Sequence, residues 1–118
     1  MSKTLVLQGE RPMSWNSFYS GGHWSKRDNE VKRVRVVVRE VLTGDEEPYQ
    51  VPVDILVTGY FAEKPQDSDN ICDKLYIDAL KGRLLNDDDS RWVRIAASCS
   101  TVDKTNPRVE IRITEVQP

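Results

Sequence analysis

Residues 67–93 read DSDNICDKLYIDALKGRLLNDDDSRWV and predict a short helix, a polar loop and the start of a strand, in that order. The helix is expected from Asp69 to Leu80, because Asp69 is a good N-cap and Gly82 is a typical residue to stop it. The NDDDS sequence forms the polar loop, and a strand is expected over residues 92–98. This part of the chain therefore supplies one helix followed by one strand.

Two further strands lie on either side of this stretch. Apolar residues alternate over 51–57, which predicts a strand with one buried face, leading to a Lys-Pro turn. Residues 108–115 alternate in the same way, and a turn at 105–107 precedes them. We expect the strands 92–98 and 108–115 to pair as an antiparallel hairpin. The apolar positions are Val51, Val53, Ile55, Val57, Val109, Ile111 and Ile113.

The amino-terminal part predicts a strand, a loop and a longer helix. Residues 4–7 read as a short strand. Residues 11–24 are irregular and are expected to be a loop, either with a role of its own or as a surface loop whose aromatic side chains cap the core. A helix is predicted from Ser25 to Leu42, capped by Ser25 and ended by Gly44. The aromatic residues are Trp15, Phe18 and Trp24, and the core positions of the helix are Val31, Val34, Val38 and Val41.

The predicted order of elements is β-α-β-α-β-β. This order indicates an α+β fold, a small mixed or antiparallel sheet with two helices on one side. The 118 residues fit a single domain, 1–118, with one hydrophobic core. A hydrophobic content of 38% and a charged content of 31% are ordinary for a globular protein and exclude a disordered chain.

Several features bear on location. No apolar run approaches the roughly 20 residues that a membrane helix needs. The first residues, MSKTLVLQGERP, lack the long apolar stretch of a secretory signal. Cys72 and Cys99 lie far apart in the sequence and form no metal-binding pair. We therefore expect reduced thiols in a cytoplasmic protein with no membrane association.

Charge is unevenly distributed along the chain. The formal net charge is −2, whereas DNA-binding proteins are usually basic. Seven aspartates lie within residues 67–89, and six lysines and arginines lie within residues 26–39. Because the two signs are separated, one face of the protein can be basic while the total stays negative. The basic run also fits a solvated helix face.

The acidic residues have the pattern of a site for a divalent cation. Asp67 and Asp69 flank one residue at the point where a helix is predicted to begin, and a third carboxylate follows from residues 87–89. Carboxylates brought together raise each other's pKa, and a cation relieves their repulsion. Oxygen ligands without histidine or cysteine suit magnesium or manganese, which can activate a water nucleophile at a phosphodiester. Lys74 could stabilise charge on the phosphate.

The acidic stretch resembles a known family of nucleases. The pattern D-x-D-N, a lysine, I-D-A-L-K-G and then D-D-S-x-x-V is similar to the RusA family of Holliday junction resolvases. A P-x-S-x-N-like segment at Pro12, Ser14 and Asn16, together with the closing hairpin, extends the resemblance over most of the chain, although only the acidic stretch is specific. The resemblance implies a homodimeric, magnesium-dependent endonuclease that nicks four-way junctions, with two sites related by two-fold symmetry.

The resemblance also assigns the site residues. It implies that Asp67, Asp69 and Asp89 are the catalytic metal ligands and that Asn70 follows the second ligand. Asp88 is the alternate for the third ligand, and counting back from the valine at 93 favours Asp89. The cofactor is expected to be magnesium, with manganese as a substitute.

Lys74 matches the essential lysine of the family but departs from its spacing. In the family the lysine follows the second aspartate by four residues, whereas Lys74 follows Asp69 by five, and Asp73 occupies the fourth place. On a regular helix four residues return to within about 40° and five to about 140°. We expect a bulge or a late helix start between Asn70 and Lys74, which would bring the lysine near Asp67 and Asp69 and leave Asp73 facing solvent or a basic partner.

Basic residues on the first predicted helix are candidates for phosphate contacts. Lys32, Arg35 and Arg39 fall within about 60° of each other around the helix axis. Arg11 and either Lys64 or Arg83 would extend this surface. The DNA-binding residues expected are therefore Lys32, Arg35, Arg39 and Asn70, reading the shape of branched DNA more than its sequence.

Three interpretations stay open at this point. The first is a junction resolvase, and the second is a nuclease of the same fold that acts on flaps or other replication branches. The third is a non-catalytic module that binds branched DNA. His23, the one histidine, can contact a phosphate or the metal site, but it also fits a structural role in a loop.

Overall fold

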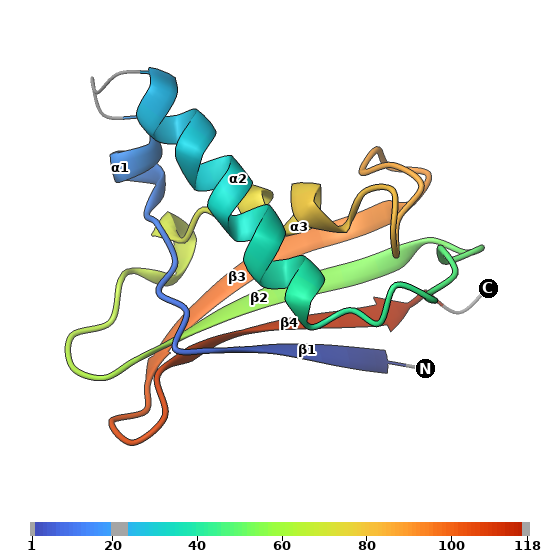
Figure 1. Cartoon of the computed structure of the whole chain (residues 1–118). Coiled ribbons are helices and arrows are strands. Elements are labelled where there is room, and N and C mark those ends of the chain that lie inside the picture. Colours follow the sequence, from blue (N-terminus) through green and yellow to red (C-terminus); the bar gives the residue numbers. More distant parts are fainter. Residues whose placement is uncertain (1, 20–23, 117–118) are drawn as a thin grey trace.

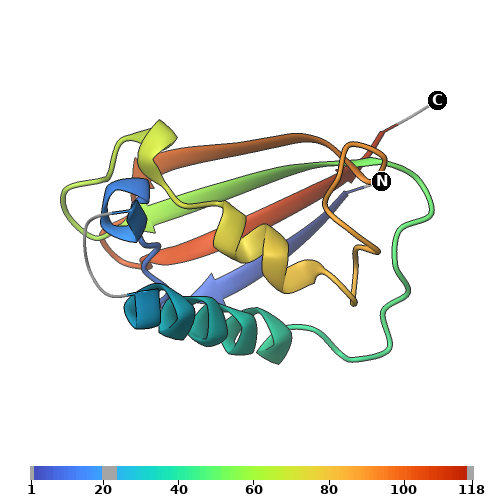
Figure 2. The ribbon, with the colours of Figure 1, turned by 90° about the horizontal axis from the view of Figure 1, so that it is seen from above.

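The computed structural model describes residues 2–19 and 24–116, without the side chains of residues 24 and 25. A four-stranded sheet is covered on one face by helices, as Figures 1 and 2 show. The mixed α+β class and the position of the helices agree with the sequence-based expectation. The elements are β1 (Ser2–Gln8), α1 (Trp15–Tyr19), α2 (Trp24–Glu40), β2 (Val53–Phe61), the 3₁₀ helix η1 (Ser68–Asn70), α3 (Lys74–Leu80), β3 (Val93–Val102) and β4 (Arg108–Glu115).

The strand order is β1-β4-β2-β3, and it contradicts the predicted hairpin. Strand β4 pairs antiparallel with both β1 and β2, while β3 pairs parallel with the other side of β2. Strands β3 and β4 are therefore not neighbours. The apolar side chains of β4 are fully buried, as suits a central strand, whereas most of β3 is exposed or half-buried, as suits an edge strand. Burial thus places β4 inside the sheet and β3 at its edge.

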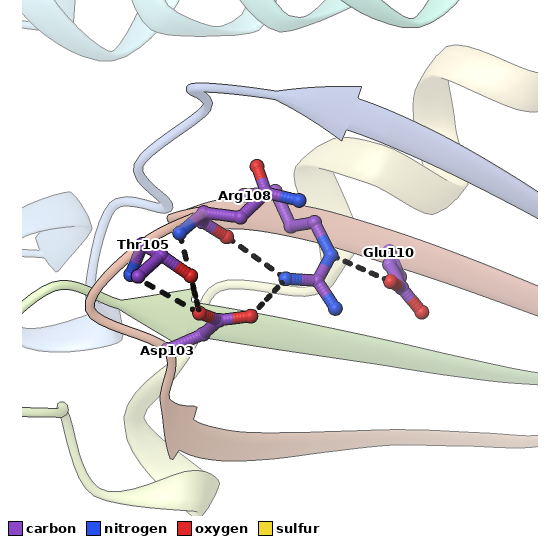
Figure 3. Close-up of polar contacts among 5 residues, drawn as sticks. Asp103, Thr105, Arg108 and Glu110 are labelled. Carbon is purple, nitrogen blue, oxygen red and sulfur yellow. Dashed lines mark hydrogen bonds and ion pairs between the residues drawn. The ribbon is translucent and has the colours of Figure 1, made fainter.

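A polar network closes the connection between β3 and β4 (Figure 3). The Asp103 carboxylate accepts hydrogen bonds from the backbone N–H groups of Thr105 and Asn106 and from the Thr105 hydroxyl. Nη1 of Arg108 donates to Asp103 at 2.8 Å, and its Nε donates to Glu110 at 2.7 Å. These bonds, first of all that of Arg108, hold the pKa of Asp103 below its usual range. The loop is therefore fixed where the chain crosses the end of β2.

The core lies between the sheet and the helices. Alternate residues of β2 and β4 point into it, as predicted, and Val34 and Val38 of α2 are buried against them. Two predicted core positions are exposed instead. Val41 is 41% exposed because α2 ends before it, and Val51 is 37% exposed because β2 begins two residues later, at Val53.

In the amino-terminal half of the chain, the helix boundaries differ from the predictions at three places. Helix α2 begins at Trp24, so Ser25 lies inside the helix and not at the predicted N-cap position. It ends at Glu40, before the predicted Leu42, and Gly44 follows with φ of 90° in the turn beyond. The segment 11–24, expected to be a loop, contains the short helix α1.

The structure describes the side chains of two of the three aromatic residues that the sequence predicted to cap the core. Trp15 and Phe18 are half-buried and pack against the core, as one of the two interpretations of this segment predicted. The side chain of Trp24 and the whole of His23 lie outside the described residues, so both predictions stay open. No helix in the described part of the chain is long and apolar enough to cross a membrane.

Candidate functional site

The chain between Asp67 and Lys74 breaks the helix that the sequence predicted from Asp69. Residues 68–70 form η1, Ile71 is extended with φ of −78° and ψ of 128°, and α3 begins at Lys74 with Asp73 in the N-cap position. The helix therefore starts late, as the extra residue between Asn70 and Lys74 predicted. Neither Asp67 nor Asp73 makes a side-chain capping bond, so both carboxylates are left for other contacts.

Helix η1 is fixed to the second half of the edge strand β3. The Ser68 hydroxyl accepts a hydrogen bond from the backbone N–H of Ser100 at 2.9 Å. The hydroxyl of Ser98 donates to the Ser68 carbonyl oxygen. The side chains of Asp67 and Asp69, on either side of Ser68, are exposed. Two of the three predicted metal ligands therefore stand on the surface beside β3.

The segment 12–16, which carries part of the family resemblance, lies along this same part of the chain. The Gln66 amide donates to the Pro12 carbonyl oxygen at 3.0 Å. The backbone N–H of Asn16 donates to Oδ1 of Asn70 at 3.2 Å. The amide nitrogen of Asn70 makes no hydrogen bond with the described residues, so it stays a candidate donor to DNA.

Gly59 of β2 permits this close packing. A Cβ atom at position 59 would lie 2.9 Å from Cε2 of Phe61, 3.1 Å from Cδ1 of Ile71 and 3.1 Å from Cγ of Pro12. Contacts this short are tighter than nearly all those that real Cβ atoms make. The absence of a side chain at Gly59 therefore lets the segments around Pro12 and Ile71 pack together over the sheet.

A second group of charged residues surrounds an open hollow of about 170 Å³ beside α3, which we call the α3 hollow. Asp78, one of the residues that line it, pairs with two lysines. Lys74 Nζ lies 3.2 Å from Oδ2 of Asp78, and Lys81 Nζ lies 3.5 Å from Oδ1. Lys81 also lies 3.2 Å from Oδ2 of Asp88. The hollow is lined by Asp73, Lys74, Ile77, Asp78, Asp88, Val93 and Ala96.

The carboxylates of the α3 hollow are in different electrostatic states. Burial raises the pKa of Asp73, which no cation offsets. Burial acts to raise the pKa of Asp88, but the hydrogen bond with the Lys81 ammonium, the charge of that ammonium and smaller contributions from Asp78 and Asp87 together outweigh it, and the net shift is downward. Oδ1 of Asp78 is buried and has no hydrogen-bond partner among the described residues. Asp73 thus has no cation partner among the described residues, whereas Asp78 pairs with two lysines although its buried Oδ1 accepts no hydrogen bond.

Asp88 and Asp89 point in different directions, which bears on the choice between them. Asp89 accepts hydrogen bonds from the backbone N–H of Arg91 at 2.9 Å and from its Nη2 at 2.8 Å. These bonds to Arg91 hold the pKa of Asp89 below its usual range. Asp88 lines the same hollow as Lys74. The structure therefore brings the alternate ligand, Asp88, to the predicted lysine and turns Asp89 toward its own loop.

Lys74 has a different partner from the one predicted. Its ion pair is with Asp78 one helical turn later, a favourable i,i+4 arrangement, and not with Asp67 or Asp69. Asp73 lines the hollow instead of facing solvent or a basic partner. The late helix start thus places Lys74 and Asp73 together, where the sequence predicted that they would separate.

The predicted ligands are spread along β3. Ser98, which contacts η1, is two residues from Ala96 and five from Val93, both of which line the α3 hollow, so the two places are about 7 to 17 Å apart along the strand. Asp67 and Asp69 therefore lie beside the second half of β3, while Asp88 and Asp89 lie at its start. Within residues 2–19 and 24–116, no three His, Cys, Asp or Glu side chains are arranged to hold a metal ion.

Sequence reasoning missed Asp78 and Lys81 as members of the site. The signal was present, because Lys74, Asp78 and Lys81 recur at the i,i+4 and i,i+3 spacing that places side chains on one helix face. We name the carboxylates beside the edge strand the acidic row. Its members are Asp67, Asp69, Asp73, Asp78 and Asp88.

The predicted basic residues of α2 are all exposed. Lys32 forms an ion pair of 3.0 Å with Asp28. Arg35 and Arg39 form no ion pair with any residue that the structure describes. Two of the three cations are therefore available to an anionic partner.

Comparison with known proteins adds no assignment to this geometry. No family model matches the chain, and no curated protein matches it significantly.

Proposed function

We propose that the protein is a metal-dependent endonuclease that cuts branched DNA, in the manner that the resemblance to RusA resolvases implies. One observation supports this best: the acidic row and two lysines lie along the edge strand β3, while α2 carries two arginines that pair with no described residue. Carboxylates repel DNA unless a cation intervenes. A site that combines them with lysines suits phosphodiester chemistry assisted by a divalent ion.

Magnesium or manganese would be held by the carboxylates of the acidic row, whose ligands are all oxygens. Such an ion supplies Lewis-acid polarisation of the phosphodiester and a water of lowered pKa. The ligands proposed from the sequence are Asp67, Asp69 and Asp89. The geometry favours Asp88 in place of Asp89, because Asp88 faces the α3 hollow and Asp89 is paired with Arg91.

The chain's own residues would supply charge and position. The ammonium of Lys74 lines the α3 hollow, where it would stabilise negative charge on a phosphate oxygen. Arg35 and Arg39 would bind phosphates away from the cut, and Asn70 would donate through its side-chain amide nitrogen. These contacts would hold the duplex arms while the scissile phosphate lies over the acidic row.

The proposal includes a homodimer, in which two copies of the protein act on one four-way junction. The sheet face opposite the helices carries Leu56, 37% exposed, and Ile95, 48% exposed, in a shallow hollow of about 260 Å³. Covering this apolar surface in a two-fold dimer would place two sites on one junction. The two free cysteines support the accompanying expectation of a cytoplasmic location.

A second candidate function is a non-catalytic module that binds branched DNA. The observation in its favour is that Lys74 and Lys81 already neutralise Asp78 and Asp88 without any metal ion. In this case the acidic row would be a structural ion-pair network. Binding of junctions without metal-dependent cleavage would favour this candidate.

The deciding experiment is a cleavage assay on a labelled four-way junction, a flap and a matched duplex, with magnesium or with EDTA. The nuclease proposal expects paired nicks in the junction with magnesium alone, lost in Asp69→Asn with the fold retained by circular dichroism. Cutting of the flap but not of the junction would reassign the substrate. Tight junction binding with no cleavage under any divalent cation would overturn the nuclease and leave the binding module.

A further inference from the structure

An exposed aromatic stack lies beside η1. On α1, the rings of Trp15 and Tyr19 are parallel within 8°, with centroids 5.4 Å apart. Trp15 is half-buried against the core, whereas Tyr19 is 64% exposed. Phe18 meets Tyr19 edge-on at 5.2 Å, which supports the ring from the side. The Trp15 ring is thus packed against the core, and the Tyr19 ring is exposed to solvent.

Positive charge adjoins this stack. An open hollow of about 330 Å³ lies between the segment 11–17 and the start of α2, and Arg11 and Lys26 line it. The acidic residue at the hollow, Glu30, is already paired with Arg33 at 2.8 Å. The guanidinium of Arg27 lies 6.0 Å from the centre of the Phe18 ring. The cations of this region therefore exceed its free acids, which suits a phosphate.

The position of α1 connects the stack to the acidic row. Asn16 of α1 donates its backbone N–H to Asn70 of η1, and Ser14 forms a β-bridge with Ile71. Figures 1 and 2 both show α1 and η1 at the same end of the sheet. A nucleic acid strand whose phosphates occupy the cationic hollow would therefore reach both Tyr19 and Asp69.

We propose that Tyr19, stacked on Trp15, is a platform for an unpaired DNA base, and that Arg11 and Lys26 bind the adjacent phosphate. This inference rests on the proposed action on DNA. It identifies the feature by which the protein would distinguish branched DNA from a duplex. A base inside a duplex has both faces covered, whereas a base freed at a branch point can stack on an exposed ring. Aromatic rings beside a positively charged groove are the usual arrangement for single-stranded DNA.

The test measures binding in EDTA, so that cleavage does not interfere. The probes are a four-way junction with 2-aminopurine at the branch point, a single-stranded oligonucleotide and a duplex of the same sequence. Tyr19→Ala should weaken binding of the first two by about 5- to 30-fold and leave duplex binding within about twofold. Tyr19→Phe should bind like the wild type. Tyr19→Leu, which keeps an apolar side chain without a ring, should behave like Tyr19→Ala.

Matched controls separate stacking from general loss of surface. Val36→Ala removes another exposed apolar side chain, from the middle of α2, and should change nothing. Lys26→Ala should weaken all three probes, whereas Lys3→Ala on β1 should not. The 2-aminopurine signal should be quenched by the wild type, Tyr19→Phe and the two control variants, and not by Tyr19→Ala or Tyr19→Leu. Equal loss on duplex and branched probes, or no loss in Tyr19→Ala, would overturn the platform.

The outcomes also separate this inference from the nuclease proposal, with cleavage by the same variants measured in magnesium. Wild-type cleavage with unchanged branch binding in Tyr19→Ala would reject the platform and leave the nuclease standing. Quenching that depends on the Tyr19 ring, without any cleavage in magnesium, would reject the nuclease and leave the platform. Failure of the wild type to bind any of the three probes would reject both.

Discussion

The phenol of Tyr76 donates a 2.7 Å hydrogen bond to Oε2 of Glu10, across 66 residues of sequence. Both carboxylate oxygens of Glu10 also accept from Arg33, at 2.8 and 2.9 Å. Glu10 is buried, so this network joins the segment before α1 to α2 and α3. Burial, and then the charge of Glu10, raise the pKa of Tyr76 well above its usual range, so the phenol stays a donor.

We predict that Tyr76→Phe lowers the free energy of unfolding by about 1.5–3 kcal/mol, the usual value for a hydrogen bond to a charged group. Urea denaturation followed by circular dichroism measures it. Tyr49→Phe is the matched control, because the half-buried Tyr49 hydroxyl makes no hydrogen bond with the described residues. Similar small effects of both substitutions would show that the buried network contributes little.

Gly59→Ala should destabilise the fold at the place where the segments around Pro12 and Ile71 meet. The added methyl would lie 3.1 Å or less from three side-chain atoms, and overpacking of this kind costs about 1–3 kcal/mol. Ile71→Val removes the Cδ1 atom, so the double variant should recover part of the loss. Additive destabilisation by the two substitutions would contradict this account.

Asp73 should make stability depend on pH in a defined direction. Burial raises its pKa in the folded protein, so between the unfolded value, about 4, and the raised value the native state binds more protons. This contribution to stability is complete below pH about 4 and is lost as the pH rises through the folded pKa.

Asp73→Asn removes that titration. The variant should melt at a higher temperature than the wild type at pH 7 and at the same temperature near pH 3. Scanning calorimetry across this range checks the slope, and Asp45→Asn, at an exposed position, is the control. A variant less stable than the wild type at pH 7 would mean that the Asp73 carboxylate makes a favourable contact instead.

Some features of the fold could be predicted from the sequence, and others could not. Alternation predicted the buried faces of β2 and β4, and the extra residue before Lys74 predicted the late start of α3. The strand order was not predictable, because a short turn at 105–107 favours a hairpin locally, while burial of β4 between β1 and β2 decides the pairing.

The candidate site shows the same division. The spacing of aspartates pointed to the stretch of chain in which the candidate site lies, and Lys74 lines a hollow together with carboxylates. Which carboxylates they are depends on where η1 and the residue 87–89 loop meet β3, and this is set by tertiary contacts such as that of Ser68 with Ser100. The family pattern favoured Asp89 and gave no indication that Asp89 pairs with Arg91.

The basic residues of α2 give a prediction about salt. If Lys32, Arg35 and Arg39 bind phosphates, their replacement by glutamate should weaken junction binding and flatten the dependence of log K on log salt by about 0.9 for each phosphate that is no longer neutralised. Binding titrations at several salt concentrations in EDTA measure the slope. Lys3→Glu, a charge reversal on β1, should leave the slope unchanged. An unaltered slope in the triple variant would make these residues a solvated helix face.

The sharpest prediction concerns Asp88 and Asp89, which the sequence ranked one way and the structure ranks the other. Asp88 faces the α3 hollow with Lys74, while Asp89 binds Arg91. If cleavage occurs at this hollow, Asp88→Asn should reduce the single-turnover rate on a junction by about 100-fold or more, because loss of even an outer-shell partner of a metal ligand costs about 10- to 100-fold. Asp89→Asn should reduce it much less, because its partner is a surface arginine.

Lys74→Ala and Lys81→Ala complete the comparison of the two aspartates. Both lysines pair with Asp78, and Lys81 also pairs with Asp88, but only Lys74 lines the hollow, so removal of Lys74 should slow cleavage more than removal of Lys81, with junction affinity retained. A larger loss of cleavage in Asp89→Asn than in Asp88→Asn would favour the ligand set of the RusA pattern. The loop of residues 87–89 would then have to change conformation when DNA and metal bind. Equal and small effects of all four variants would place the chemistry at Asp67 and Asp69 instead, beside the second half of β3.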